Sequence, residues 1–367
     1  MLTAEIAGGG VAGLVASIQL ARQGWSVRLH ERAHGLRASG NGFPIFENGL
    51  RVLEALGLRD EIPKRGHQLD RWVIRRSNGD KVVEYEPFAA TGGRIVMFWR
   101  QALVDMLAET AAKAGVRIEL GSRVVAADRR GMLQLENGER LKADLVIGAD
   151  GVHSAVRKTV AGELPLGRHR KGAIRLMIPI EDGDFAPGEE RTAVEHNDPS
   201  GRRIGLYPCS REIMYMILVH LLDDTEVAGV PIDPQKWKAT FPHLGKYIDR
   251  VGSMGHFDEY HSIDPPAWHY GNCAIVGDAA HGMTPALGQG ANCAMMTGYT
   301  LGSSDFSNYS IPDALERWEQ FMRPRIRFVQ DFAEGMTAGR LDPKNEIFFS
   351  DPALRPLFST DVAKLKW

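Results

Sequence analysis

The first thirty residues alternate between short apolar segments and glycine-rich turns. Residues 4–7 form an apolar run that ends at a glycine triplet. Over residues 11–20 apolar side chains recur at helical spacing, and Gly24 is a typical helix stop. Residues 25–30 then alternate like a strand and end at Glu31. This pattern predicts a β–α–β unit, the unit from which doubly wound sheets are built.

The next segments continue the mixed pattern as far as residue 149. The spacing predicts helices over residues 48–56 and 100–113, and strands over 72–74, 81–85, 116–120, 124–128, 132–136 and 144–149. The last of these strands is continuously apolar, which is typical of a strand buried on both faces of a parallel sheet.

From about residue 172 the pattern changes to strand-like segments with few long helices. A buried-strand pattern returns at residues 272–276, a helix of small residues is predicted at 291–301, and a helical tail bent at Pro324 is predicted at 313–339. We therefore expect three parts: a discontinuous first domain (1–70, 100–172 and 267–302), a β-rich domain (71–99 and 173–266) and a C-terminal helical segment (303–367).

Composition narrows the possible functions. The 44 Lys and Arg nearly balance the 46 Asp and Glu, which argues against a nucleic-acid-binding surface. No apolar run of about 18 residues occurs, so no membrane span is predicted. The cysteines, Cys209, Cys273 and Cys293, are too few for a disulfide framework and lack metal-binding spacing, so no metal is expected. The N-terminal residues do not resemble a signal peptide, and we expect a cytoplasmic protein.

The first glycine turn fits G-x-G-x-x-G, with a strand before it and a helix after it. Gly8 would permit the tight turn, Gly10 would let a pyrophosphate approach the backbone, and Gly13 would let helix and strand pack closely. The helix N-terminus would present free N–H groups to the phosphates. Glu31 ends the second strand, where a carboxylate would bind ribose hydroxyls. The motif predicts a dinucleotide and does not distinguish NAD from FAD.

Two more glycine–acid motifs follow predicted strands. The first runs from Gly148 to Arg157 and contains Asp150, and the second begins Gly277-Asp278 and continues to the glycines before Asn292. Ligands of open α/β sheets bind at such strand ends. Taken singly, the first motif could be a capped turn with Ser154 as N-cap.

Together the three motifs resemble those of the single-component FAD-dependent aromatic hydroxylases, and the resemblance covers nearly the whole chain. It implies an α/β fold: a Rossmann-like FAD-binding domain of the p-hydroxybenzoate hydroxylase type, an inserted β-sheet substrate domain and a C-terminal helical segment. It also implies FAD as cofactor, NADH or NADPH as transient co-substrate, and O2. No second G-x-G-x-x-G occurs, so no separate NAD(P)H domain is expected.

The resemblance implies which residues contact FAD. Glu31 would bind the adenosine ribose, main chain near Val124 the adenine, and Asp278 the ribityl chain, while Ala291 N–H would point at the flavin and stabilise the negative charge of its reduced form. The full set of implied cofactor residues is Gly8, Gly10, Gly13, Glu31, Arg32, Arg37, Arg100, Val124, Asp150, Asp278, Gly290, Ala291 and Asn292. No side chain is assigned as catalytic, and His281 is interpreted as a packing or hydrogen-bonding residue.

Within the family, the chain looks most like the 2-methyl-3-hydroxypyridine-5-carboxylic acid oxygenases. That likeness implies substrate contacts from Arg203, Tyr215 and Pro285. An arginine in a dry pocket suits a ring carboxylate, although arginines are mostly exposed and Arg203 could be a surface strand residue. Pro44 and Leu69 stand where tyrosines are expected, so the ring substituents could differ.

We therefore expect an NAD(P)H- and O2-dependent hydroxylase of a small aromatic acid, such as a hydroxypyridinecarboxylate, working as a monomer or homodimer. Hydroxylation with or without ring opening stays open, as does a benzenoid substrate such as salicylate or hydroxybenzoate. The alternatives of another class are an FAD-dependent reductase of similar fold and a non-catalytic flavin-binding module.

Overall fold

The predicted β–α–β unit forms the centre of the first sheet. The structure is a computed structural model and describes residues 1–36, 42–78, 81–85, 93–339 and 364. Here β1 (Thr3–Ala7), α1 (Val11–Arg22) and β2 (Ser26–Glu31) follow one another as predicted. The six strands of this sheet lie in the order β18-β19-β12-β1-β2-β8. The other four strands are β8 (Arg117–Leu120), β12 (Leu145–Gly148), β18 (His269–Tyr270) and β19 (Cys273–Ile275).

All neighbouring strands of this sheet are parallel except the edge pair β18–β19. The carboxyl ends of β1, β12 and β19 therefore lie side by side, and each is followed by one of the three glycine motifs. α1 packs against α9 (Gly290–Gly302), where a Cβ on Gly298 would lie 2.6 Å from the carbonyl oxygen of Ala12. This close contact requires glycine and brings the third motif against the first.

Smaller elements surround the first sheet. The predicted hairpin becomes a three-stranded sheet of β9 (Val124–Ala127), β10 (Met132–Leu135) and β11 (Arg140–Lys142), and α5 (Ala155–Ala161) packs on β9. A second small sheet consists of β3 (Gly42–Phe46), β7 (Ile95–Trp99) and β4 (Gly66–Leu69). In the sequence α2 (Glu47–Ala55) follows β3, α3 (Ile62–Arg65) precedes β4, and α4 (Arg100–Lys113) follows β7. Thus β7, expected in the β-rich domain, pairs outside its main sheet.

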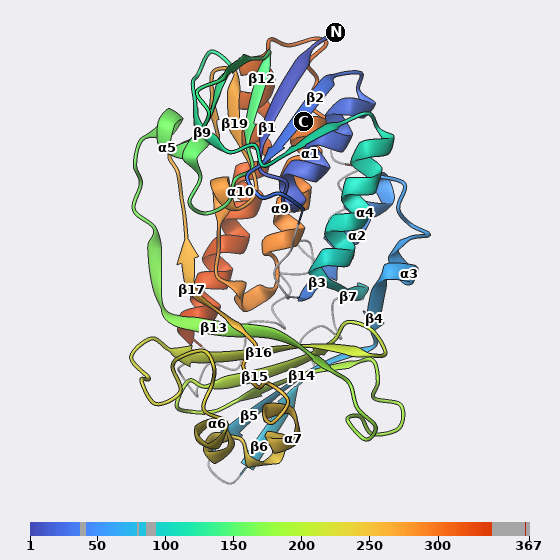
Figure 1. Ribbon diagram of the computed structural model, residues 1–367, viewed down its shortest axis with the longest axis vertical. Helices are drawn as coiled ribbons and strands as arrows, with labels where there is room; N and C mark the ends of the chain where they lie inside the picture. The colour runs from blue at the N-terminus through green and yellow to red at the C-terminus, as the bar shows by residue number, and fades with distance from the viewer. Residues whose placement is uncertain (37–41, 79–80, 86–92, 340–363, 365–367) are drawn as a thin grey trace.

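The β-rich region forms a seven-stranded sheet at the other end of the long axis of the molecule (Figure 1). Its strands, in sheet order, are β17 (His256–Ser262), β13 (Gly167–Pro179), β16 (Ile213–Leu221), β15 (Arg203–Pro208), β14 (Thr192–Asn197), β5 (Arg71–Asn78) and β6 (Lys81–Tyr85). The pairing is antiparallel apart from β14 with β5. Its outer face packs on α6 (Pro234–Thr240), η2 (Pro242–Leu244) and α7 (Gly245–Ile248), where Trp237 is fully buried.

The C-terminal part of the described chain is helical. α8 (Asp278–His281) and η3 (Pro285–Leu287) lead into α9, and α10 runs from Ile311 to Gly339 as one helix that includes Pro324. Trp318 of α10 is fully buried and donates to Thr300 of α9 at 3.0 Å. α10 therefore packs against α8, η3 and α9, the elements that carry the third glycine motif. Within the described ranges, no helix combines the length and the apolar character needed to cross a bilayer.

Candidate active site

The first glycine turn has the shape that a pyrophosphate requires. Gly8 has φ +104°, and a Cβ there would lie 2.3 Å from the carbonyl oxygen of Ala149, at the end of the neighbouring strand. A Cβ on Gly13 would lie 2.1 Å from the oxygen of Gly8. At Gly10, in contrast, an added Cβ would meet nothing within 4 Å. Two glycines therefore close the turn on the protein side, and the third leaves its outer side open, as a phosphate cradle requires.

Glu31 sits beside this turn. Its carboxylate accepts from the backbone N–H of Gly9 at 2.9 Å and of Ala33 at 2.9 Å. Its carbonyl oxygen accepts from the N–H of Ser122, two residues before Val124 begins β9. The residues implied for ribose and adenine thus come from adjacent segments. These residues fit the adenosine half of FAD.

The charged side chains of the second motif, Asp150 and Arg157, form hydrogen bonds with other groups of the protein. Asp150 accepts from the hydroxyl of Ser154 and from the N–H of Ala155 at 2.7 Å, so it organises the start of α5. Burial raises the pKa of Asp150, while these hydrogen bonds oppose the shift. Arg157 is buried and donates to the carbonyl oxygen of Ala279 at 2.9 Å. The motif therefore ties the second glycine turn to the third.

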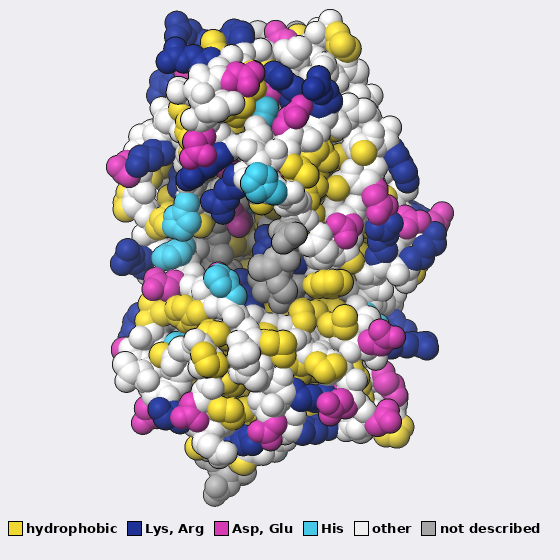
Figure 2. Space-filling view, in the orientation of Figure 1, with side chains coloured by type: hydrophobic (Ala, Val, Ile, Leu, Met, Phe, Trp, Pro, Cys, Tyr) yellow, Lys and Arg dark blue, Asp and Glu magenta, His cyan; other side chains and the backbone are white. Residues whose placement is uncertain are grey.

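A cavity of about 430 Å³ extends from the glycine turns to the inner face of the seven-stranded sheet. The face in Figure 2 is hollowed between the two halves of the molecule, with histidine side chains beside the hollow. At the turn end the lining includes Gly10, Arg100, Asp278, Pro285, Gly290 and Ala291. At the sheet end it includes Trp72, Arg175, Glu195, Arg203, Tyr207, Tyr215, Asp258 and Tyr260.

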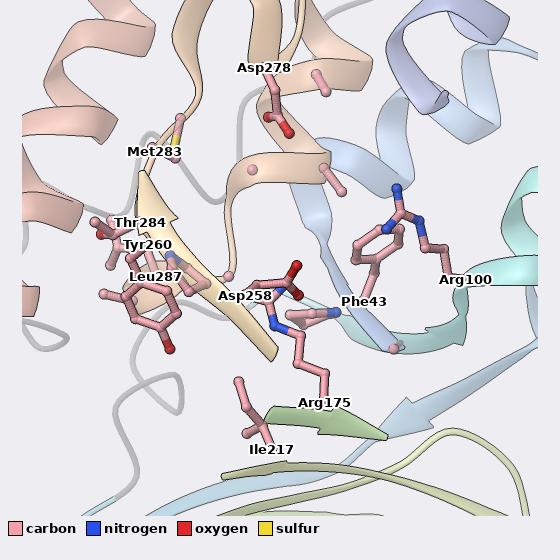
Figure 3. Close-up of a pocket in the computed structure, with 18 of the residues that line it drawn as sticks. Phe43, Arg100, Arg175, Ile217, Asp258, Tyr260, Asp278, Met283, Thr284 and Leu287 are labelled. Atoms are coloured by element: carbon pink, nitrogen blue, oxygen red, sulfur yellow. The ribbon is translucent and has the colours of Figure 1, made fainter. Parts of the chain in front are cut away.

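Opposite charges face the turn end of the cavity (Figure 3). Asp278 is exposed to the open cavity. Desolvation by the surrounding cavity walls raises its pKa, and the positive charges of Arg100 and Arg175 oppose this shift. The Arg100 guanidinium lies 5.1 Å from the ring centre of Phe43, and burial lowers the pKa of Arg100. This polar, charged end fits the ribityl part of FAD.

Asp278→Asn is expected to stabilise the apoprotein and weaken FAD binding. Because its folded-state pKa is raised, ionised Asp278 destabilises the fold at neutral pH, and this effect fades as pH falls through that pKa toward the unfolded value of 3.8. Thermal melts between about pH 4 and about pH 7 should show the variant gaining most at neutral pH. Titration of apoprotein with FAD should show a loss of roughly tenfold or more. Unchanged affinity would remove Asp278 from the cofactor site.

The start of α9 closes the cavity beside Asp278. Gly290 and Ala291 line the cavity at the N-terminal turn of the helix. The Asn292 side chain is buried: it accepts from the N–H of Phe46 at 3.0 Å and donates to the oxygen of Pro44 at 3.1 Å. Asn292 thus fastens β3 to α9.

The remaining predicted cofactor residues and His281 lie in different places. Arg32 is exposed, and Arg37 lies outside the described residues. His281 is buried behind the cavity, with Nε2 3.0 Å from the Thr297 hydroxyl, and burial lowers its pKa to about 4. The neutral imidazole packs against Trp268, at a centroid distance of 5.3 Å.

Both predicted substrate side chains of the β-rich region reach the cavity wall. Arg203 is buried and donates to Glu195 at 2.9 Å, and Tyr207 donates to the other oxygen of the same carboxylate at 2.8 Å. Tyr215 is buried, which raises its pKa to about 12 and keeps its hydroxyl protonated. The sequence did not reveal Glu195 as the partner of Arg203.

Arg175 of β13 was also missed and lies in the middle of the cavity, where it points toward Asp258 (Figure 3). The two side chains are 3.3 Å apart, and Asp258 is 34% exposed. Among the described residues, the buried Arg175 Nε has no hydrogen-bond partner, and neither has the buried Tyr260 hydroxyl. The signal available in the sequence is an arginine between Ile174 and Leu176 in an apolar strand.

Comparisons with known proteins agree with this geometry. A family model described as FAD binding domain matches residues 1–305. A putative 2-heptyl-3-hydroxy-4(1H)-quinolone synthase of Rhodococcus erythropolis is 36% identical, over 90% of this chain and 86% of the relative. The 3-amino-4-hydroxybenzoate 2-monooxygenase of Streptomyces cremeus is 30% identical, over 88% and 84%. A tetrameric form of 2-methyl-3-hydroxypyridine-5-carboxylic acid oxygenase matches with TM-score 0.92 and 35% identity, over 100% of this chain and 98% of that one.

Proposed function

The chain belongs to the FAD-binding-domain family and is an FAD-dependent monooxygenase of aromatic compounds, and from this premise we propose that its substrate is a hydroxylated N-heteroaromatic acid such as a hydroxypyridinecarboxylate. The cofactor FAD and the enzyme class that the family resemblance implied are confirmed. The reductase and the non-catalytic module are not favoured, because the relatives are monooxygenases.

FAD, when bound, accepts hydride from NADH or NADPH and activates O2 for transfer of one oxygen atom to the ring. The chain itself supplies the cradle of Gly8, Gly10 and Gly13 and the polar contacts of Glu31 and Asp278. The apolar and aromatic lining of the cavity excludes water around the ring. The seven-stranded sheet supplies the groups that orient the ring.

The observation that carries the proposal is an arginine in this wall that a ligand can reach. Arg175 lines the cavity with its side chain 21% exposed, and its ion-pair partner Asp258 is itself 34% exposed. A phenolate or carboxylate oxygen of the ring would accept hydrogen bonds from this guanidinium. Tyr215, which lines the same cavity and stays protonated, is a further donor. Arg203, Tyr215 and Pro285 remain proposed substrate residues, with Arg175 added.

A second candidate substrate is an uncharged bicyclic ring of the 4-quinolone type. The described cavity lining carries three arginines (Arg100, Arg175, Arg203) against four carboxylates (Glu195, Asp258, Glu259, Asp278). This lining has no excess of positive charge to attract an acid. A relative at 36% identity is named for a hydroxyquinolone product, which supports the same candidate.

Oxidation of NADH and NADPH should be measured with the FAD-loaded enzyme against a panel of hydroxypyridine carboxylates, hydroxybenzoates and 2-alkyl-4-quinolones. The expected result is stimulation by one ring class, with one atom from 18O2 in the product. Stimulation confined to the quinolones would select the second candidate. A product without the label from 18O2 would contradict hydroxylation.

A further inference from the structure

We infer that Glu195 is a specificity-determining residue: it neutralises Arg203 within the cavity wall, so that this part of the cavity accepts an uncharged ring edge and rejects a carboxylate. The inference rests on the proposed function in one respect, namely that an aromatic ring occupies the sheet end of the cavity. Of the two arginines at the sheet end, it assigns the recognition of an acidic group to Arg175.

The pairing of the strands places Glu195 and Arg203 together. β14 and β15 are antiparallel neighbours, with Glu195 opposite Gly205 and Asn197 opposite Arg203, so both charged side chains project from the same face. Gly205 has no side chain, and the Tyr207 ring fills the space above it: a Cβ there would lie 2.4 Å from the Tyr207 hydroxyl oxygen that donates to Glu195.

Burial makes this ion pair a fixed part of the wall. Glu195 is 3% exposed and Arg203 is 7% exposed, and both line the cavity. Each oxygen of the carboxylate has its own donor, Arg203 on one and Tyr207 on the other. A substrate carboxylate that sought Arg203 would have to displace an acid that is already desolvated and hydrogen-bonded. Placed beside Glu195 instead, the substrate acid would be repelled.

The second arginine of the sheet end is held differently. Arg175 and Asp258 are separated by 3.3 Å, and their side chains are 21% and 34% exposed, against 8% and 3% for Arg203 and Glu195. An incoming anion can therefore bind Arg175 while Asp258 stays solvated. Arg175 is thus available to an anionic ligand and Arg203 is not, because the carboxylate beside Arg175 is partly exposed and the one beside Arg203 is buried.

The test compares the FAD-loaded wild type with Glu195→Gln and with Tyr207→Phe. Two ligands of the same shape, 5-hydroxynicotinate and 5-hydroxynicotinamide, are titrated, and Kd is read from the change in flavin absorption. In Glu195→Gln the preference for the acid over the amide should rise at least about tenfold, because Arg203 becomes available. Tyr207→Phe removes a hydrogen bond from the same carboxylate but keeps the charge, and its preference should stay at the wild-type value.

Glu195→Gln leaves a buried charge without its partner, so it should melt at a lower temperature than the wild type. The acid should raise its melting temperature more than the amide does, since the acid replaces the missing charge. The double variant Glu195→Gln/Arg203→Gln removes both charges and should return the ligand preference toward that of the wild type.

An unchanged acid-to-amide preference in a folded, FAD-loaded Glu195→Gln would overturn the assignment. If neither ligand perturbs the flavin of any variant, the proposed substrate class fails instead. The assignment is then judged by the midpoint potential of bound FAD, which should rise in Glu195→Gln and return in the double variant. Equal potentials in all three would reject it.

Discussion

Gly13→Val is expected to give a protein that neither holds FAD nor keeps its native stability. The added Cβ would lie 2.1 Å from the carbonyl oxygen of Gly8 and 3.2 Å from the Cβ of Ala149. The first contact is with backbone, so α1 would have to move away from β1 and β12, at a cost above about 3 kcal/mol. Thermal melting should show the loss of stability, and the purified protein should be colourless.

Gly10→Ala is the matched control, because it changes the same turn where space is free. Its Cβ would meet no protein atom within 4 Å, so the melting temperature of the apoprotein should stay within about a degree of the wild type. The methyl group would project to the open side of the turn and weaken FAD binding. A Gly13→Val protein with normal melting and normal flavin content would contradict the cradle described above.

Arg175→Met is expected to lower kcat/KM for the physiological ring by about 2–4 kcal/mol, or roughly 30- to 1000-fold. Methionine keeps most of the apolar stem but removes the partly exposed guanidinium that lines the cavity. The ring would lose its anchor at the sheet end, so KM should rise and more of the NAD(P)H consumed should appear as H2O2. Steady-state kinetics with a peroxide assay measures both.

Arg175→Lys is the corresponding control and should recover part of the loss, because it keeps the charge without the fork of N–H donors. Arg203→Met should behave differently: it leaves Glu195 buried without its cation, so the main effect should be on thermal stability. If Arg203→Met matched Arg175→Met in kinetics while melting normally, Arg203 would be the substrate anchor and Arg175 would not.

Most of the fold could be predicted from the sequence, because its elements have strong local patterns. The helix at residues 100–113 was predicted to the residue. β1 and β12 follow from apolar runs that end at or next to glycine, and β2 follows from an alternating pattern that ends at Glu31. The helices α6 and α7 were missed because they are only seven and four residues long, too short for a helical repeat of apolar residues to show. The p-hydroxybenzoate hydroxylase-like fold is confirmed.

From the residues alone, without the family resemblance, the site was predictable where glycine and acid stand next to each other in sequence. Asp278 follows its glycine directly, so its place at a strand end could be read from one segment. Glu195 and Asp258, in contrast, were missed because each pairs with an arginine of a neighbouring strand, and the pattern of one strand does not give its register with the next. Arg175 and Asp258 are far apart in the sequence, whereas Glu195 precedes Arg203 by only eight residues across one turn. Arg203 was therefore recognised without the carboxylate that determines its role.

The order of the six-stranded sheet bears on how the protein is made. Its central strand β1 lies next to β12, whose other neighbour β19 is more than a hundred residues further along the chain, and α1 is covered by α9. During synthesis the apolar face of α1 therefore stays uncovered until residues 290–302, which form α9, have left the ribosome. Such non-local topologies fold slowly and expose apolar surface meanwhile. We expect yield in cells to depend on chaperones, and FAD to stabilise the chain only after residue 302 has emerged.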